Sequence, residues 1–199
     1  SPPTAPLRQR RLTPLVRPPT EVLIMIGNWQ HQQASEPRRY LDYAFANLRA
    51  SADVCARMIS NDKEQTWANA SVVLFLEAHA VELFLKGAIL SVKPNIRFGG
   101  QQGHDLNSLS DLYDQEFSDQ KFKFYVPFKD EYLGFTADEI DALKNEHKGE
   151  SPSMLFRYPV KSSQQEWPGI HGFDPSISLE SLRSLQSDFE RISNLLTIP

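Results

Sequence analysis

The chain has 199 residues, of which 40% are hydrophobic and 23% are charged, so its length fits one domain and its composition excludes wholesale disorder. A net charge of −4 argues against a protein that coats nucleic acid over its whole surface. The single cysteine, Cys55, excludes an intramolecular disulfide framework and a multi-cysteine zinc site, and it fits a reducing compartment. We therefore expect a cytoplasmic protein.

The first 20 residues differ in composition from the rest of the chain. They contain six prolines, four arginines and no acidic residue. Because proline cannot continue a helix and this stretch has few apolar residues for a core, we predict an extended basic arm over 1–20 and a single helical domain over 21–199. The arm is either a solvated leader or a tail that binds phosphate groups or wraps a partner. The apolar run EVLIMIG follows at 21–27, either as a lone strand or as a segment docked on the core.

Hydrophobic spacing then predicts two long helices. The first runs from about 37 to 59, with Ser35 as its N-cap, and its apolar residues recur at steps of three or four: Leu41, Phe45, Leu48, Ala52, Cys55 and Ile59. The second runs from about 67 to 92 and is apolar nearly all round, which is typical of a central helix buried by its neighbours. Its ionisable residues exclude a membrane span, because such groups are costly in hydrocarbon: Glu77, His79, Glu82 and Lys86.

Three further helices complete the predicted fold. Leucine spacing predicts one helix after the GHDL phrase and a last helix from about 179 to 196, capped by Ser178. Between these two helices, a capping box formed by Thr136 and Glu139 predicts the start of a short helix that ends near 148. The connection 149–177 carries four prolines and four aromatic residues, and we expect it to fold back over the bundle. With almost no alternating strand pattern, the sequence predicts an all-α fold, an antiparallel bundle of four to five helices.

Polar residues of the second long helix gather on one side of it. On an ideal helix Ser71, His79, Glu82 and Lys86 fall within an arc of about 80°. Glu82 and Lys86 have the spacing and the order that favour an ion pair, and His79 lies one turn before them, in reach of Glu82. Two interpretations follow: a buried polar seam that fixes the helix register, which the apolar surroundings favour, or one wall of a charged pocket.

The phrase RFGGQQGHDL at 97–106 holds the residues best suited to chemistry. His104 directly precedes a predicted helix, where an imidazole can cap free backbone amides or act as a base. Asp105 adds a carboxylate that the positive end of a helix favours. Arg97 and His104 bracket a glycine-rich loop, so the two could meet over one phosphate, where arginine stabilises developing charge and histidine moves a proton. This is the minimal equipment for cleaving RNA.

Three phrases in order give the chain a family resemblance. HAVELFLKGAIL at 79–90, GHDLNSL at 103–109 and FRYPV at 156–160 resemble the HEPN-like helical domains, and the likeness covers about 36–196. It implies an antiparallel bundle of four or five helices, often a homodimer, with RNA cleavage or nucleotide binding in toxin–antitoxin, phage-defence or RNA-processing systems. It also implies that Arg157, in the third phrase, joins a polar pocket with His79, Glu82, Lys86 and Asp105.

The chain departs from the catalytic pattern of that family. Active members carry an arginine and a later histidine with four to six residues between them, with a polar residue straight after the arginine, on a late helix. Here the matching pair is Arg97 and His104, on a glycine loop, with Phe98 after the arginine. We therefore expect a non-catalytic module that dimerises and binds a cognate protein, a nucleotide or RNA; the alternative is a metal-independent endoribonuclease that uses Arg97 and His104. We expect no cofactor and no metal, because the histidines lack metal-ligand spacing.

Overall fold

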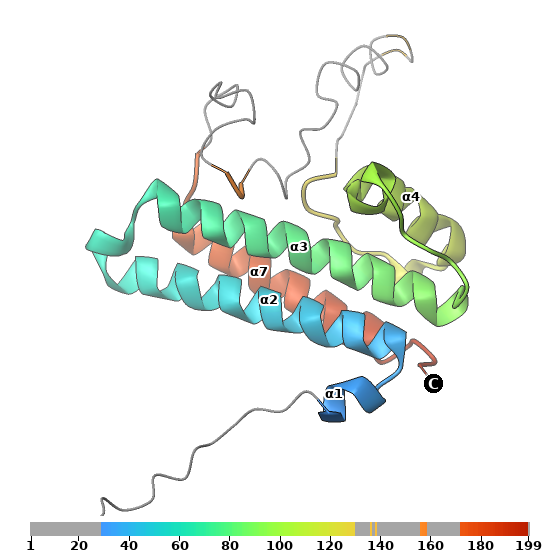
Figure 1. Cartoon of the computed structure of the whole chain (residues 1–199). Helices are drawn as coiled ribbons and strands as arrows, with labels where there is room; N and C mark the ends of the chain where they lie inside the picture. Colours follow the sequence, from blue (N-terminus) through green and yellow to red (C-terminus); the bar gives the residue numbers. More distant parts are fainter. Residues whose placement is uncertain (1–28, 130–135, 137, 139–155, 159–171, 199) are drawn as a thin grey trace, which may run out of the picture.

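The computed structural model describes residues 29–129, 136, 138, 156–158 and 172–198 (Figure 1). The predicted arm over 1–20, the apolar run at 21–27 and most of the connection 149–177 lie outside these residues. So does the helix expected after Thr136, apart from two isolated positions.

The described part of the chain is entirely helical in its regular structure. It contains no strand, which confirms the all-α prediction, and its helices pack together in one bundle. Short 3-10 turns separate several of the helices, at Asp62–Glu64, Gln101–His104 and Gln120–Phe122. The α-helices are α1 (Trp29–Gln33), α2 (Glu36–Ser60), α3 (Trp67–Val92), α4 (Leu106–Glu116) and α7 (Pro175–Ser193).

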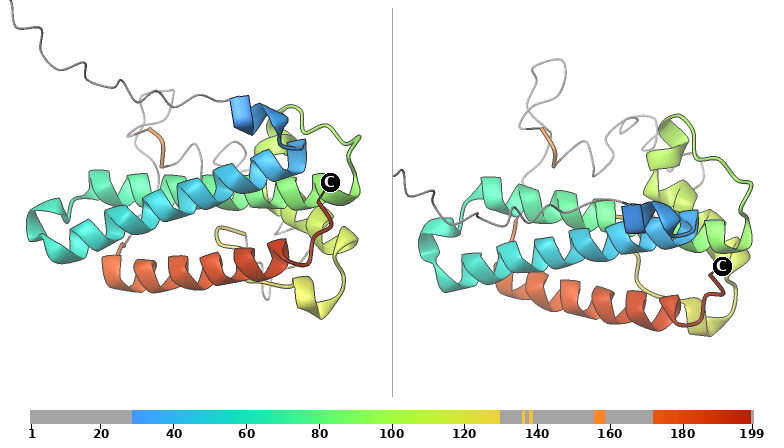
Figure 2. Two further views of the ribbon diagram at one scale, coloured as in Figure 1. Left: turned by 90° about the horizontal axis from the view of Figure 1, so that it is seen from below. Right: turned by 60° about the horizontal axis from the view of Figure 1, so that its bottom comes forward.

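Three long helices form the body of the bundle (Figure 1). Helices α2 and α3 form an antiparallel hairpin and pack along their length, and α7 packs against both of them. The other views show that the start of α2 and the ends of α3 and α7 lie at the same end of the bundle (Figure 2). Helix α4 packs on α3 near that end. This arrangement places the C-terminal half of α3 beneath α4 and the loop that precedes it.

Helix α3 is the central helix, as its composition predicts. Every residue from Ala80 to Leu90 is buried, and the helix begins at Trp67 and ends at Val92 as expected. Thr66 caps its start by accepting a hydrogen bond from the Asn69 amide at 3.3 Å. No described helix has the length and apolar content needed to cross a membrane.

The apolar stripe of α2 continues differently from the prediction at its last turn. Leu41, Leu48 and Cys55 are buried as expected, but Ile59 is 42% exposed. The stripe takes a step of three after Cys55, so that Met58 points into the core and Ile59 turns away from it. Ser35 is the N-cap residue of α2, although its side chain forms no capping hydrogen bond.

Helix α7 begins earlier than the prediction placed it. Its N-cap is Asp174, whose carboxylate accepts the amides of Ser176 and Ile177 at 2.8 and 3.1 Å, and Pro175 occupies the first turn. The prediction of Ser178 as the cap is therefore wrong. An aspartate followed by a proline satisfies the free amides and presets the backbone for a helix, which makes it the stronger start signal.

The core is built around an aromatic contact between α3 and α7. The rings of Phe84 and Phe189 stack with centroids 3.8 Å apart, and Phe45 and Phe124 meet Phe189 edge to face. Gly87 lets α2 approach α3 closely, because a Cβ atom there would lie 2.9 Å from Leu41. These contacts fix the position of α3 relative to α2 and α7. They therefore also fix the position of the polar residues near the C-terminal end of α3.

Candidate functional site

The centre of the polar cluster is an ion pair inside α3. Lys86 Nζ lies 2.7 Å from Glu82 Oε1, and the two side chains are 7% and 4% exposed. The i,i+4 spacing on one helix brings the pair together without any rearrangement of the chain. Because each charge would be costly to bury alone, each stabilises the burial of the other. The sequence prediction of this pair is confirmed.

The third member of the cluster comes from the loop before α4. His104 Nδ1 lies 3.0 Å from the same carboxylate oxygen of Glu82, and the imidazole side chain remains 63% exposed. The turn Gln101–His104 carries the imidazole across the C-terminal half of α3. The cluster therefore has a buried acid and lysine beneath an accessible histidine.

His79 does not take the place that the helical spacing suggested. Its ring stacks on that of Phe75, with centroids 5.9 Å apart and planes 7° apart, while His104 holds the carboxylate of Glu82. The Glu82 carboxylate contacts Lys86 and His104, and its charge still acts on His79 one turn before it.

The pKa of His79 shows which charges surround it. Burial lowers this pKa most strongly, the carboxylate of Glu82 opposes the shift, and the positive charges of Lys86, His104 and Arg157 lower it further. Arg157, assigned to the site by family resemblance, thus lies close enough to act on the same imidazole. Its guanidinium lies 5.4 Å from the centre of the Tyr158 ring.

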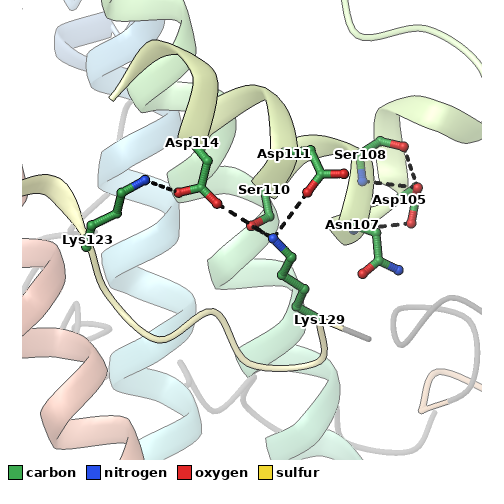
Figure 3. A network of polar contacts seen from close by, with 8 residues as sticks. All are labelled: Asp105, Asn107, Ser108, Ser110, Asp111, Asp114, Lys123 and Lys129. Carbon is green, nitrogen blue, oxygen red and sulfur yellow. Dashed lines mark hydrogen bonds and ion pairs between the residues drawn. The ribbon is translucent and has the colours of Figure 1, made fainter. Parts of the chain in front are cut away.

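Asp105 caps α4, and His104 does not. The Asp105 carboxylate accepts the backbone amides of Asn107 and Ser108 at 3.3 and 3.2 Å and the Ser108 hydroxyl at 2.5 Å (Figure 3). An aspartate at this position satisfies the free amides better than a histidine one residue earlier, whose ring is engaged by Glu82. The capping role expected for His104 therefore belongs to its neighbour.

Arg97 is directed away from the cluster. Its Nη1 donates hydrogen bonds to the carbonyls of Pro94 and Ile96, at 3.3 and 2.9 Å, so the guanidinium folds back on its own loop. It lines a cavity of about 200 Å³ together with Phe98, Ser108 and Leu112, on the side of the loop that faces α4. The structure does not bring Arg97 and His104 together over one position, as the nuclease interpretation requires.

The spacing rules missed two partners of the cluster. Phe98 places its ring 5.6 Å from Lys86 Nζ, so the lysine lies between an acid and an aromatic face. Phe75 supports His79 as described above. Phe75 could have been found from its i,i+4 spacing to His79, whereas Phe98 lies twelve positions after Lys86, on a loop with no periodicity.

A second polar network joins α4 to the chain that follows it. Lys129 Nζ contacts Ser110 and Asp111 at 3.1 and 3.2 Å, and Lys123 pairs with Asp114 at 2.5 Å (Figure 3). A cavity of about 200 Å³ lies beside these residues, next to Tyr125. The lysines and aspartates balance one another, and they hold the chain after Gln120–Phe122 against α4.

Glu77 is the one buried acid of α3 that pairs with no described side chain. It is 7% exposed, and burial raises its pKa to about 7. Burial and the nearby charge of Glu77 raise the pKa of the Cys55 thiol to about 11, so this thiol is a core group and not an activated nucleophile. The prediction that Cys55 belongs to the core is confirmed.

No cluster of three metal-ligating side chains occurs among the described residues. Comparison of the chain with protein-family models, with curated proteins and with solved structures finds no match in any of the three. The site must therefore be interpreted from its own geometry.

Proposed function

We propose that the chain is a HEPN-like helical module that binds RNA or a nucleotide without cleaving it, with His104 and Arg157 as its contacts to phosphate. The observation that carries this proposal is the exposed imidazole of His104, held from beneath by the buried carboxylate of Glu82. Glu82 and Lys86 neutralise each other, so the guanidinium of Arg157 adds positive charge to the surface above them. Such a surface suits an anionic ligand.

The three phrases of the family resemblance support the same proposal, because they converge on one cluster. Glu82 and Lys86 come from the first phrase, His104 from the second and Arg157 from the third. Residues so distant in sequence gather around one imidazole, His79. Convergence of this kind is what a binding site built from several loops and helices requires.

Dimerisation is part of the proposal. Apolar side chains remain exposed near the end of the bundle where α3 and α7 begin, among them Val72 and Ile177, which is 66% exposed. Exposed apolar side chains near one end of a small chain favour a symmetric contact with a second copy. We further propose a role in defence, in a toxin–antitoxin pair or in RNA processing, with a cognate protein as a second partner.

Binding of a fluorescently labelled single-stranded RNA, measured by anisotropy in EDTA, tests the proposal. We expect salt-dependent binding that His104→Ala and Arg157→Ala each weaken by about tenfold, because each removes a charged contact. Arg183→Ala, which removes an exposed arginine of α7, is the matched control and should bind like the unchanged protein. Unlabelled ATP in competition separates a nucleotide site from one that needs a longer strand. No binding of either ligand would refute the proposal.

One observation favours the endoribonuclease alternative. A carboxylate that holds one nitrogen of an imidazole is the arrangement that prepares a histidine to act as a base. Gel analysis of the same RNA after incubation in EDTA decides between the two functions. Intact RNA is expected, whereas cleavage that disappears in both His104→Ala and Arg97→Ala would establish the alternative.

A further inference from the structure

We infer that Glu82 is a positioning residue for His104, which it holds in the tautomer with the proton on Nδ1, so that Nε2 is the nitrogen presented to a ligand. The identity of that ligand rests on the proposed function. The tautomer is a property of the free protein and does not depend on any ligand.

The chemistry of one oxygen atom carries the inference. Lys86 Nζ at 2.7 Å and His104 Nδ1 at 3.0 Å both contact Glu82 Oε1. An ammonium group at that distance favours the ionised carboxylate, and an ionised carboxylate accepts hydrogen bonds but cannot donate one. His104 Nδ1 must therefore be the donor, and it must carry a proton in both charge states of the ring.

The two partners of the contact between Glu82 and His104 differ in burial. Glu82 is fixed by the helix and by Lys86 and is 4% exposed, whereas the His104 side chain is 63% exposed. The carboxylate is therefore the rigid partner and the imidazole the one that is oriented. Because Nδ1 is occupied by the buried acid, Nε2 remains for contact with solvent or ligand.

The tautomer of His104 determines which hydrogen-bonding groups of a ligand can pair with Nε2. A neutral His104 accepts a hydrogen bond at Nε2, and a protonated His104 donates one there. The preferred ligand therefore presents a hydroxyl donor beside a phosphate oxygen, so that either charge state finds a partner while Arg157 takes the negative charge. A sugar phosphate with a free hydroxyl next to the phosphate has this chemistry.

The tautomer can be measured directly in nitrogen-15-labelled full-length protein. Long-range proton–nitrogen spectra, recorded where the neutral imidazole dominates, distinguish a protonated Nδ1 from a protonated Nε2, and His104→Ala identifies the signals. We expect a protonated Nδ1 in the unchanged protein. A protonated Nε2 would overturn the inference without reference to any variant.

The double variant Glu82→Met/Lys86→Met removes the acceptor without leaving a buried charge. We expect His104 in this variant to populate both tautomers, and RNA binding to weaken by less than in His104→Ala, because the imidazole is retained but no longer held in one tautomer. Glu77→Gln alters an equally buried acid of the same helix and should change neither readout. An unchanged tautomer in the double variant would refute the role of Glu82.

The two hypotheses fail separately. A protonated Nδ1 together with no binding of RNA or nucleotide would refute the proposed function and leave the positioning role of Glu82 intact. RNA binding that depends on His104, in a protein whose His104 carries its proton on Nε2, would support the proposed function and refute the positioning role of Glu82.

Discussion

His104 and Glu82 are 22 positions apart in the sequence, and their side chains meet at 3.0 Å. The contact joins a residue of the loop before α4 to the most buried stretch of α3. It also shares one carboxylate oxygen with Lys86, so a single atom links the interior of the bundle to its surface.

The buried ion pair should behave differently when one or both partners are removed. Lys86→Met leaves the Glu82 carboxylate buried with only the partly exposed His104 as its partner, and it should lower the free energy of unfolding by about 3–5 kcal/mol. Glu82→Met/Lys86→Met should cost much less, because no charge remains to be buried. Urea unfolding of the three proteins measures both values. Equal losses in the single and double variants would contradict the prediction.

The exposed pair between Arg38 and Asp42 provides the control for this experiment. It has the same i,i+4 spacing and a distance of 2.9 Å, but its side chains are 59% and 41% exposed. Arg38→Met should therefore lower the free energy of unfolding by less than about 1 kcal/mol.

Glu77 should make stability depend on pH. Its pKa is about 7 in the folded chain, above its ordinary value of 4.5, so the folded state binds more protons than the unfolded state between these two values. The contribution of Glu77 to the free energy of unfolding should then fall by about 3 kcal/mol as the pH rises from 4.5 to 7 and level off above it. Glu77→Gln should remove this component and be the more stable protein near pH 8. Thermal unfolding over this pH range provides the measurement, and parallel pH profiles for the two proteins would contradict it.

A side chain at position 87 should lower the stability of the bundle. A Cβ atom would lie 2.9 Å from Leu41 Cδ2 and 3.1 Å from the backbone oxygen of Pro37, so in Gly87→Ala the Leu41 side chain must shift and α2 must yield by a few tenths of an ångström. We expect a net loss of about 1 kcal/mol, because overpacking outweighs the better helix propensity of alanine. Gly172→Ala, where a Cβ atom meets nothing within 4 Å, is the control for a glycine substitution without overpacking. Denaturant unfolding that shows Gly87→Ala to be stabilising would refute this account.

The chain should form a homodimer in solution. Val72 on α3 and Ile177 on α7 leave apolar surface exposed near the same end of the bundle, and its burial against a second copy would favour association. Light scattering at micromolar concentration should give about twice the 22.7 kDa of one chain. Val72→Glu should shift the mass toward that of one chain, while Ala50→Glu, an exposed position of α2, should not. A mass of one chain for the unchanged protein would contradict the prediction.

Residue spacing in the sequence predicted the features that depend on neighbouring helical turns. It did not predict the contacts between residues far apart in the sequence. Two features of α3 were predicted because each is a pattern within neighbouring turns of one helix. They are its all-round apolar character and the i,i+4 ion pair of Glu82 and Lys86. The contact between Glu82 and His104 depends on the path of a glycine-rich loop, which has no period to interpret. Hydrophobic spacing placed the start of α7 near Leu179, because the turn from Asp174 to Ser178 has only one large apolar residue, Ile177, and that residue faces solvent.

Asp105, rather than His104, should control the start of α4. Its carboxylate accepts the amides of Asn107 and Ser108, so Asp105→Ala should lower the free energy of unfolding by about 1 kcal/mol, and Asp105→Asn should recover most of the loss. Hydrogen exchange supplies the local readout: the amides of Asn107 and Ser108 should exchange faster in Asp105→Ala and at an unchanged rate in His104→Asn. Faster exchange of these two amides in His104→Asn would return the capping role to the histidine. With the helix start assigned to Asp105, a loss of ligand binding in His104→Asn would reflect the imidazole itself and not an unravelled α4.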